Sequence, residues 1–277
     1  MNAVEPVRAE ARAPTFVFLH GWAMTPAVWA PIIAHLPGRR CIAPALPGHA
    51  GALPAGGGEI AGWAAPLIPT LPPATVLVGW SLGALLALEL ARRAPQRVRR
   101  LVLIGGSARF VADDDGLPDG WPGLAPETVA AFRASFSGDP RATLKRFLAL
   151  QCLGEPDRRG TQALLGAALT PLAGMPPDND PAAGRPDGAA DPVLTAALAD
   201  GLALLSTADL RPALPAIAQP SLLIHGAHDA LMPIAAAHRL AQALPRARLE
   251  TLADSGHALP LTRSADCARL IAEFADE

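Results

Sequence analysis

Residues 75–94 read TVLVGWSLGALLALELARRA, and this stretch decides the fold. The apolar run 75–79 is typical of a buried strand, and residues 82–94 are typical of a helix. Between them, residues 79–83 match G-x-S-x-G, a tight strand-to-helix turn that lifts the hydroxyl of Ser81 out at the carboxyl end of a sheet. Taken alone, the pattern also fits a glycine-rich turn whose serine caps the helix.

Five further apolar runs predict the other strands of a sheet, at residues 15–19, 40–44, 101–104, 221–225 and 248–252. Helical patterns follow the last two runs, at residues 233–244 and 265–274. Strands that alternate with helices favour an α/β fold, and continuous apolar runs are typical of strands buried on both faces. We therefore expect a mostly parallel central sheet flanked by helices.

The connection between the strands at 101–104 and 221–225 is far too long for an ordinary loop. It carries four helical patterns of its own, at residues 126–136, 140–152, 161–169 and 192–206. We expect an inserted helical cap at residues 107–207, on a core made of residues 1–106 and 208–277. Within the cap, residues 171–192 are rich in Pro and Gly and predict a mobile loop.

A serine hydroxyl needs a general base to become a nucleophile, and the base needs an acid that orients it. His257 follows the last predicted strand, and Asp229 follows the strand at 221–225. The chain order Ser81, Asp229, His257 is the order expected for an α/β-hydrolase triad. Two alternatives stay open, since Asp229 also suits the cap of the following helix and Asp209 is a second candidate for the acid.

The negatively charged intermediate of such a reaction needs two hydrogen-bond donors. We assign them to the backbone N–H groups of Leu82, which follows the serine, and of Trp22, in the loop after the first strand. His20 is expected to orient that loop. His225 and His228 invite a metal site with Asp229, but no third ligand cluster is apparent, and we expect no metal ion.

The composition excludes several classes of protein. The chain has 277 residues, a net charge of −2, 51% hydrophobic residues and no tyrosine, so it is neither disordered nor basic enough to bind nucleic acid by charge. Three cysteines without a C-x-x-C pair, Cys41, Cys152 and Cys267, favour a reducing compartment. The longest apolar stretch, 74–88, is too short for a membrane span. We expect a cytoplasmic monomer that does not bind membranes.

With these residues in place, the chain resembles the α/β-hydrolases of the pimeloyl-[acyl-carrier protein] methyl ester esterase type. The matching segments are 19–22, 79–83, 121–124, 146–151, 209–211 and the loops of Asp229 and His257. The resemblance runs from residue 15 to the C-terminus. Trp80 and the cap segments 121–124 and 146–151 are more specific to this family than the triad is.

The resemblance implies that a serine carboxylesterase hydrolyses the methyl ester of pimeloyl-[acyl-carrier protein] in biotin synthesis. The products are methanol and the free carboxylate on the carrier protein. Ser81 attacks the ester, His257 moves the proton, Asp229 holds the imidazole, and no cofactor takes part. Three alternatives remain: a carboxylesterase for short free esters, a lactonase or carbon–carbon bond hydrolase with the same triad, and a non-catalytic binding protein of this fold.

The resemblance also suggests residues that contact the acyl chain and the carrier protein. Acyl contacts are expected at Trp22, Trp80, Leu82 and Phe147, whereas Phe132 and Phe136 suit the core of the cap. Residues 133–159 hold six cationic side chains against three acidic ones, which predicts docking of the acidic carrier at Arg146 and Arg159; solvated surface is the alternative.

Two departures from the family pattern stand out near the second strand and in the cap. Ala45 replaces the usual acidic residue before Leu-Pro-Gly, and His49-Ala50-Gly51 replaces an aromatic-Gly turn. His49 is expected on a loop near the entrance of the site. The cap also looks longer than usual. The run Asp113–Asp115 is expected to be a solvated acidic stretch.

Overall fold

The computed structural model describes residues 13–113, 120–169 and 191–277 and contains one six-stranded sheet. The strands are β1 (Thr15–Leu19), β2 (Arg40–Ile42), β3 (Thr75–Trp80), β4 (Val98–Ile104), β5 (Ser221–Gly226) and β6 (Ala247–Leu252). Their order is β2-β1-β3-β4-β5-β6, and every neighbouring pair is parallel. This confirms the predicted mostly parallel sheet.

The register brings the carboxyl ends of the central strands to one edge. Leu19 pairs with Gly79, Gly79 with Leu103, and Gly226 with Leu252. The loops that follow β1, β3, β5 and β6 therefore meet at this edge, as the sequence pattern requires for the candidate triad.

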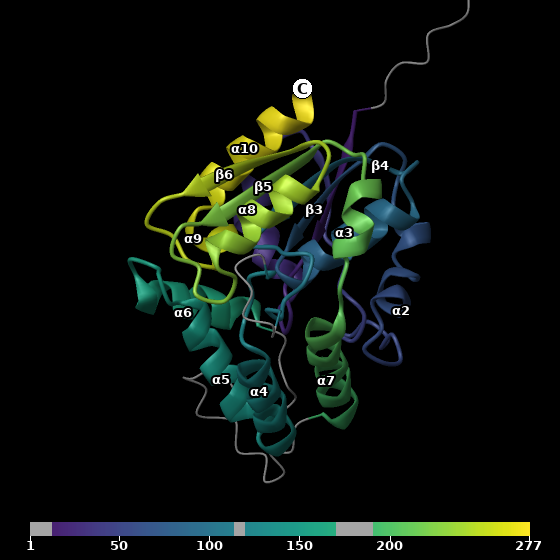
Figure 1. The fold of residues 1–277 in the computed structure, drawn as a ribbon. Coiled ribbons are helices and arrows are strands. Elements are labelled where there is room, and N and C mark those ends of the chain that lie inside the picture. Colours follow the sequence, from purple (N-terminus) through teal and green to yellow (C-terminus); the bar gives the residue numbers. More distant parts are fainter. Residues whose placement is uncertain (1–12, 114–119, 170–190) are drawn as a thin grey trace, which may run out of the picture.

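Helices cover both faces of the sheet, and the direction of each crossover decides which face. Because β–α–β crossovers are right-handed, α3 (Leu82–Arg93) and α8 (Ile234–Ala243), which step the same way along the sheet, share a face. The connection through α1 (Ala30–Ala34) steps the opposite way and covers the other face, where α1 packs on α10 (Ser264–Asp276). Both faces of the central strands are buried as a result, which accounts for their continuous apolar runs (Figure 1).

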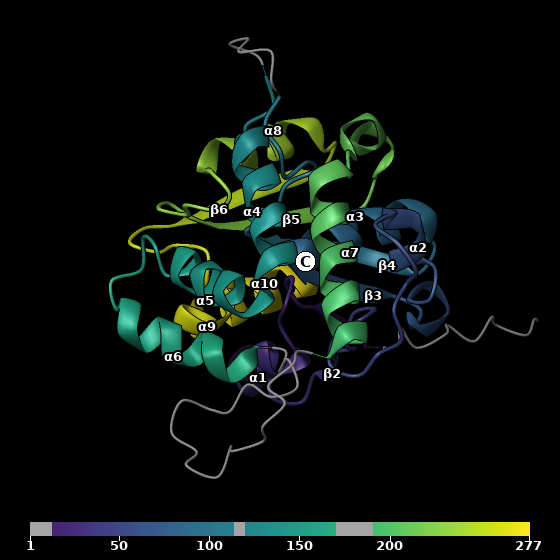
Figure 2. The ribbon, with the colours of Figure 1, turned by 90° about the horizontal axis from the view of Figure 1, so that it is seen from below.

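Four helices lie between β4 and β5 in the chain: α4 (Pro126–Gly138), α5 (Pro140–Gln151), α6 (Arg158–Ala168) and α7 (Pro192–Thr207). They gather at the end of the molecule where the carboxyl edge of the sheet lies (Figures 1 and 2). The helix α4 packs on α5 and α7, and α6 reaches α9 (Leu259–Thr262). Most of the expected mobile loop, 171–192, lies outside the described residues.

Side-chain caps explain where three of these helices begin. Asp139, Asp157 and Asp191 precede α5, α6 and α7, and each carboxylate accepts a hydrogen bond from a backbone N–H of the first turn. None of the helices in the described ranges combines the length and apolar character needed to cross a membrane.

Candidate active site

Ser81 occupies a strained turn between β3 and α3. Its backbone has φ +55° and ψ −116°, a conformation that non-glycine residues rarely adopt. The flanking glycines are sterically required: a Cβ on Gly79 would lie 2.2 Å from the carbonyl oxygen of Gly83, and a Cβ on Gly83 would lie 2.0 Å from that of Leu19. This close packing is the physical basis of the G-x-S-x-G pattern.

The loops after β5 and β6 bring Asp229 and His257 together. Nδ1 of His257 lies 2.7 Å from Oδ2 of Asp229, and both side chains are almost fully buried. The other oxygen of Asp229 accepts hydrogen bonds from the N–H groups of Leu231 and Met232. These contacts fix the carboxylate, so that it orients the imidazole ring.

The pKa of Asp229 lies below its usual range although the carboxyl is buried. Burial alone would raise this pKa, but the electrostatic effect of the neighbouring His257 and its hydrogen bond lower it. His225 and the N–H of Met232 act in the same direction. The carboxyl is therefore ionised at neutral pH and accepts a hydrogen bond from Nδ1–H of the imidazole.

Gly105, directly after β4, lies against the ring of His257 and also lines the pocket of Ser81. A Cβ on Gly105 would lie 3.2 Å from Nδ1 and Cε1 of His257, and Gly105 lines a small pocket with Ser81. The second ring nitrogen of His257, Nε2, is buried and has no hydrogen-bond partner among the described residues. It is available to take a proton from a reacting group.

Two backbone N–H groups next to Ser81 are free to bind an oxyanion. Among the hydrogen bonds of the described residues, none uses the N–H of Trp22 or of Leu82. By contrast, the N–H of Ala23 binds His49 and that of Met24 binds Gly21. Trp22 lies in the loop whose Gly21 approaches Ser81, since a Cβ there would be 3.6 Å from the serine Cβ. Both N–H groups therefore remain candidates for the two donors that an oxyanion needs.

Two buried histidines cross-link the loop after β1 to the loop after β2. Nε2 of His20 accepts the N–H of Leu46, and Nε2 of His49 accepts the N–H of Ala23, each at 3.0 Å. His20 thus orients its loop as expected, and His49 lies on a loop as predicted, but its side chain is fully buried.

Both histidines must stay neutral to accept these hydrogen bonds. Burial, reinforced by the neighbouring His49, lowers the pKa of His20 to about 3. Burial also lowers the pKa of His49 to about 4, against the opposing effect of its hydrogen bond to the carbonyl of Pro47. Each ring therefore keeps an unprotonated Nε2 throughout the neutral range.

Trp80 contacts the backbone of His257 and does not line the pocket of Ser81. Its ring is fully buried, its Nε1 donates to the carbonyl oxygen of His257 at 2.9 Å, and its centroid lies 5.6 Å from the imidazole. Leu82 is also fully buried. Neither side chain lines the pocket of Ser81 or the apolar cavity beside it, so the expected acyl contacts of Trp80 and of the Leu82 side chain find no support.

A narrow apolar cavity of about 50 Å³ continues from the pocket of Ser81, with which it shares Phe110 and Leu205. Trp22, Phe132 and Phe147 line it, although Phe132 was expected in the core of the cap. The ring of Trp22 lies edge-on to those of Phe132, Phe136 and Phe147, with centroids 4.9 to 6.0 Å apart. Phe136 is buried behind it, as expected for a residue of the cap core.

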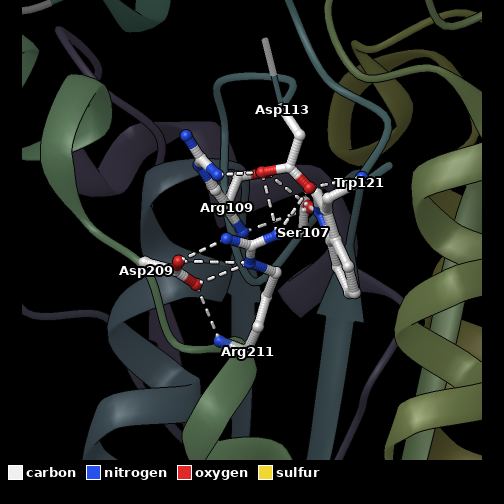
Figure 3. A network of polar contacts seen from close by, with 6 residues as sticks. All are labelled: Ser107, Arg109, Asp113, Trp121, Asp209 and Arg211. Atoms are coloured by element: carbon white, nitrogen blue, oxygen red, sulfur yellow. Dashed lines mark hydrogen bonds and ion pairs between the residues drawn. The ribbon is translucent and has the colours of Figure 1, made fainter. Parts of the chain in front are cut away.

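A network of charges joins the chain as it leaves β4 to the chain as it returns to β5 (Figure 3). Arg211 donates to both Asp209 and Asp113, Arg109 also contacts Asp113, and Nε1 of Trp121 donates to Ser107. Asp113 is only 18% exposed, so the expectation of a solvated acidic run is wrong for this residue. Asp114 and Asp115 lie outside the described residues.

The hydrogen-bond partners of the acidic and histidine side chains distinguish between the two candidates for the triad acid and bear on the alternative of a metal site. The carboxylate of Asp209 accepts hydrogen bonds from Arg211, whereas the carboxylate of Asp229 accepts the hydrogen bond from His257. His225 donates Nε2 to the carbonyl of Met232, whereas His228 is exposed and lies near Asp254. No group of three potential ligand side chains is present among the described residues.

Arg146 on α5 and Arg159 on α6 are both exposed. No ion pair within the described residues engages either of them. Arg146 lies one helical turn before Leu150, which lines the apolar cavity and is 39% exposed. One residue of the cavity lining is therefore partly exposed and lies one helical turn from a cationic side chain.

Known proteins resemble this chain along almost its whole length. Residues 14–264 match the model of the alpha/beta hydrolase fold. A pimeloyl-[acyl-carrier protein] methyl ester esterase of Aromatoleum aromaticum is 48% identical, over 93% of this chain and 96% of the relative. Its counterpart in Nitrosomonas europaea is 35% identical, over 91% and 92%.

The chain belongs to the α/β hydrolase family, among the pimeloyl-[acyl-carrier protein] methyl ester esterases. This confirms the resemblance drawn from the sequence motifs. Solved structures agree on the fold of this α/β-hydrolase. An esterase from Exiguobacterium antarcticum superposes with a TM-score of 0.76 at 21% identity, covering 95% of this chain and 92% of its own. An enol-lactonase from Burkholderia xenovorans reaches 0.75 at 21%, covering 98% and 94%.

Proposed function

We propose that this protein hydrolyses the methyl ester of pimeloyl-[acyl-carrier protein], releasing methanol and the free pimeloyl carboxylate on its carrier. The observation that carries the proposal is the buried Asp229–His257 pair beside Ser81 in a chain 48% identical to an esterase of that name. In this proposal Ser81, His257 and Asp229 form the catalytic triad, and the N–H groups of Trp22 and Leu82 form the oxyanion hole.

The reaction proceeds in two halves on this geometry. Ser81 attacks the ester carbonyl while His257 Nε2 takes the hydroxyl proton and passes it to the departing methoxide, which leaves as methanol. Asp229 holds the imidazole through Nδ1 and stabilises its positive charge. Water then attacks the acyl-serine by the same route, and the carboxylate product leaves with the carrier.

The acyl chain lies in the apolar cavity lined by Trp22 and Phe147, within a cap formed by residues 107–207. The cavity of about 50 Å³ is smaller than the cavity of about 150 Å³ that holds a benzene molecule in another protein. Side chains that line it must therefore move when an acyl chain enters. The exposed Arg146 and Arg159 dock the acidic carrier protein. The enzyme acts as a cytoplasmic monomer.

Growth of a bacterium that needs biotin because its own esterase gene is deleted tests the proposal. The wild-type gene is expected to restore growth without biotin, and the Ser81→Ala variant is expected to fail although it is expressed in soluble form. A soluble wild-type protein that does not restore growth would favour a carboxylesterase for free esters. Absence of any Ser81-dependent ester hydrolysis would favour a non-catalytic binding protein.

A further inference from the structure

Glu155, between α5 and α6, lies against the loop that carries His257. Its Oε1 accepts hydrogen bonds from the N–H of Gly256 at 3.0 Å and from the N–H of Ala258 at 3.2 Å. These are the residues immediately before and after His257. The side chain is only 6% exposed, so water competes little for these charge-assisted hydrogen bonds.

The backbone on both sides of this contact is packed too closely to shift without loss. A Cβ on Gly256 would lie 2.4 Å from the carbonyl oxygen of Leu153 and 3.1 Å from Oε1 of Glu155. On the opposite side, a Cβ on Gly226 would lie 2.1 Å from the carbonyl oxygen of Gly256. The histidine loop is therefore held between β5 and the segment that contains Glu155.

Three separate contacts then fix His257. Asp229 binds its ring, Trp80 binds its carbonyl oxygen, and Glu155 binds the N–H groups of its two neighbours. Only the contact from Glu155 comes from the connection between β4 and β5, more than 100 residues away in the chain. The position of this connection is thereby linked to the position of the imidazole.

We propose that Glu155 is a positioning residue that holds the His257 loop, and with it the imidazole, beside the pocket that Ser81 lines. This inference rests on the proposed function, in which His257 is the general base. Glu155 touches no substrate and acts only through the backbone of the loop. A displacement of about 1 Å at a catalytic group lowers turnover roughly 100-fold, which gives such a contact a direct effect on kcat.

Three variants test this role: Glu155→Ala removes both hydrogen-bond acceptors, Glu155→Gln keeps an oxygen at the same place, and Asp157→Ala is the control. Asp157 caps α6 through the N–H of Gly160 and makes no hydrogen bond or ion pair with residues 253–258 among the described residues. Asp157→Ala thus removes a carboxylate from the same segment and weakens α6, but it leaves the hydrogen bonds to the histidine loop in place. Each protein is assayed with p-nitrophenyl butyrate, and rates are divided by the fraction of Ser81 that a p-nitrophenyl phosphonate labels.

The expected result for Glu155→Ala is a kcat lowered by roughly 10- to 100-fold with KM nearly unchanged. Glu155→Gln should stay within about 3-fold of wild type, and Asp157→Ala should lose thermal stability but keep its kcat. The low-field N–H proton resonance of the His257–Asp229 hydrogen bond should shift or broaden in Glu155→Ala alone.

Three outcomes would overturn the inference. Unchanged kcat per labelled serine in Glu155→Ala would leave Glu155 a purely structural role, and so would an equal loss in Asp157→Ala. An equal loss in Glu155→Gln would show that the oxygen acceptor is not what matters. Comparison of wild type with Ser81→Ala in the same assay identifies a failure of the proposed function itself. In that case wild type shows no Ser81-dependent hydrolysis.

Discussion

Ser81 carries the backbone strain that the site depends on. A non-glycine residue at φ +55° costs about 1–3 kcal/mol, and the contacts of Gly79 and Gly83 with neighbouring carbonyl groups leave the turn no alternative. The sequence motif was sufficient to predict this residue because the steric requirement falls on adjacent positions. Glu155, His49 and Trp80 were not recognised as supports, since their partners lie far away in the chain.

His49 provides a test of how the oxyanion loop is held. Replacing it with Leu leaves the buried N–H of Ala23 without a partner, so the loop that carries Trp22 should loosen. We expect kcat for a free ester to fall about 10-fold or more, as when an oxyanion donor is weakened, with a smaller effect on KM. Steady-state kinetics measure this.

The matched variant His49→Gln keeps an acceptor near the position of Nε2 and should recover most of the rate. If His49→Leu turns over as fast as wild type, the histidine cross-link is dispensable for holding Trp22. In that case the free N–H of Trp22 is fixed by other contacts, such as the hydrogen bond from its indole to Leu198.

At the scale of elements, the sequence predicted all six strands and the long helices to within a few residues. Continuous apolar runs marked the strands, but β4 begins earlier than expected, at Val98, because Arg99 and Arg100 interrupt its apolar pattern. The short helices α1, α2 (Ile60–Ala64) and α9 were missed because four or five residues show no helical period. Their packing on longer helices holds them.

The charge network around Arg211 joins the segment that follows β4 to the segment that precedes β5. Replacing Arg211 with Gln leaves Asp113 and Asp209 facing each other with fewer donors. We expect a loss of about 1–3 kcal/mol in the free energy of unfolding, because the carboxylates are only partly exposed. Urea denaturation measures it.

Arg269→Gln is the control for this prediction. It breaks an exposed ion pair with Glu273 on α10, and exposed pairs contribute well under about 1 kcal/mol. Equal losses in the two variants would mean that the network is no stronger than ordinary surface charge.

For the whole molecule, the two buried histidines predict sensitivity to acid. Their pKa values of about 3 and about 4 lie below the ordinary value of 6.5, so the unfolded chain binds protons first as the pH falls. The stabilisation is complete above pH 6.5 and is lost as the pH falls towards 4 and then 3. At pH 5 the loss should be roughly 2 kcal/mol for each histidine.

Urea denaturation at pH 7 and pH 5 checks this prediction. His49→Gln should reduce the pH-dependent difference, whereas replacing the exposed His35 with Gln should not. A stability that stays level between pH 7 and pH 5 would contradict neutral, buried histidines at these positions.

The exposed arginines of α5 and α6 predict how the carrier-bound substrate is recognised. Reversing the charge at Arg146 and Arg159 should lower kcat/KM for the carrier-bound ester about 10-fold at low salt, and high salt should reduce this difference. The free ester should be unaffected. Arg269→Glu, the same change on α10, is the control. Unchanged kinetics on the carrier substrate would exclude docking at these two residues.

The most direct test of the proposed function compares wild type and Ser81→Ala on the methyl ester of pimeloyl-[acyl-carrier protein] and on a short free ester. Methanol release is measured for the first and acid release for the second. We expect wild type to have a much higher kcat/KM on the carrier-bound ester than on the free ester. Ser81→Ala should be inactive on both esters. Equal or better use of the free ester by wild type would contradict the proposed function.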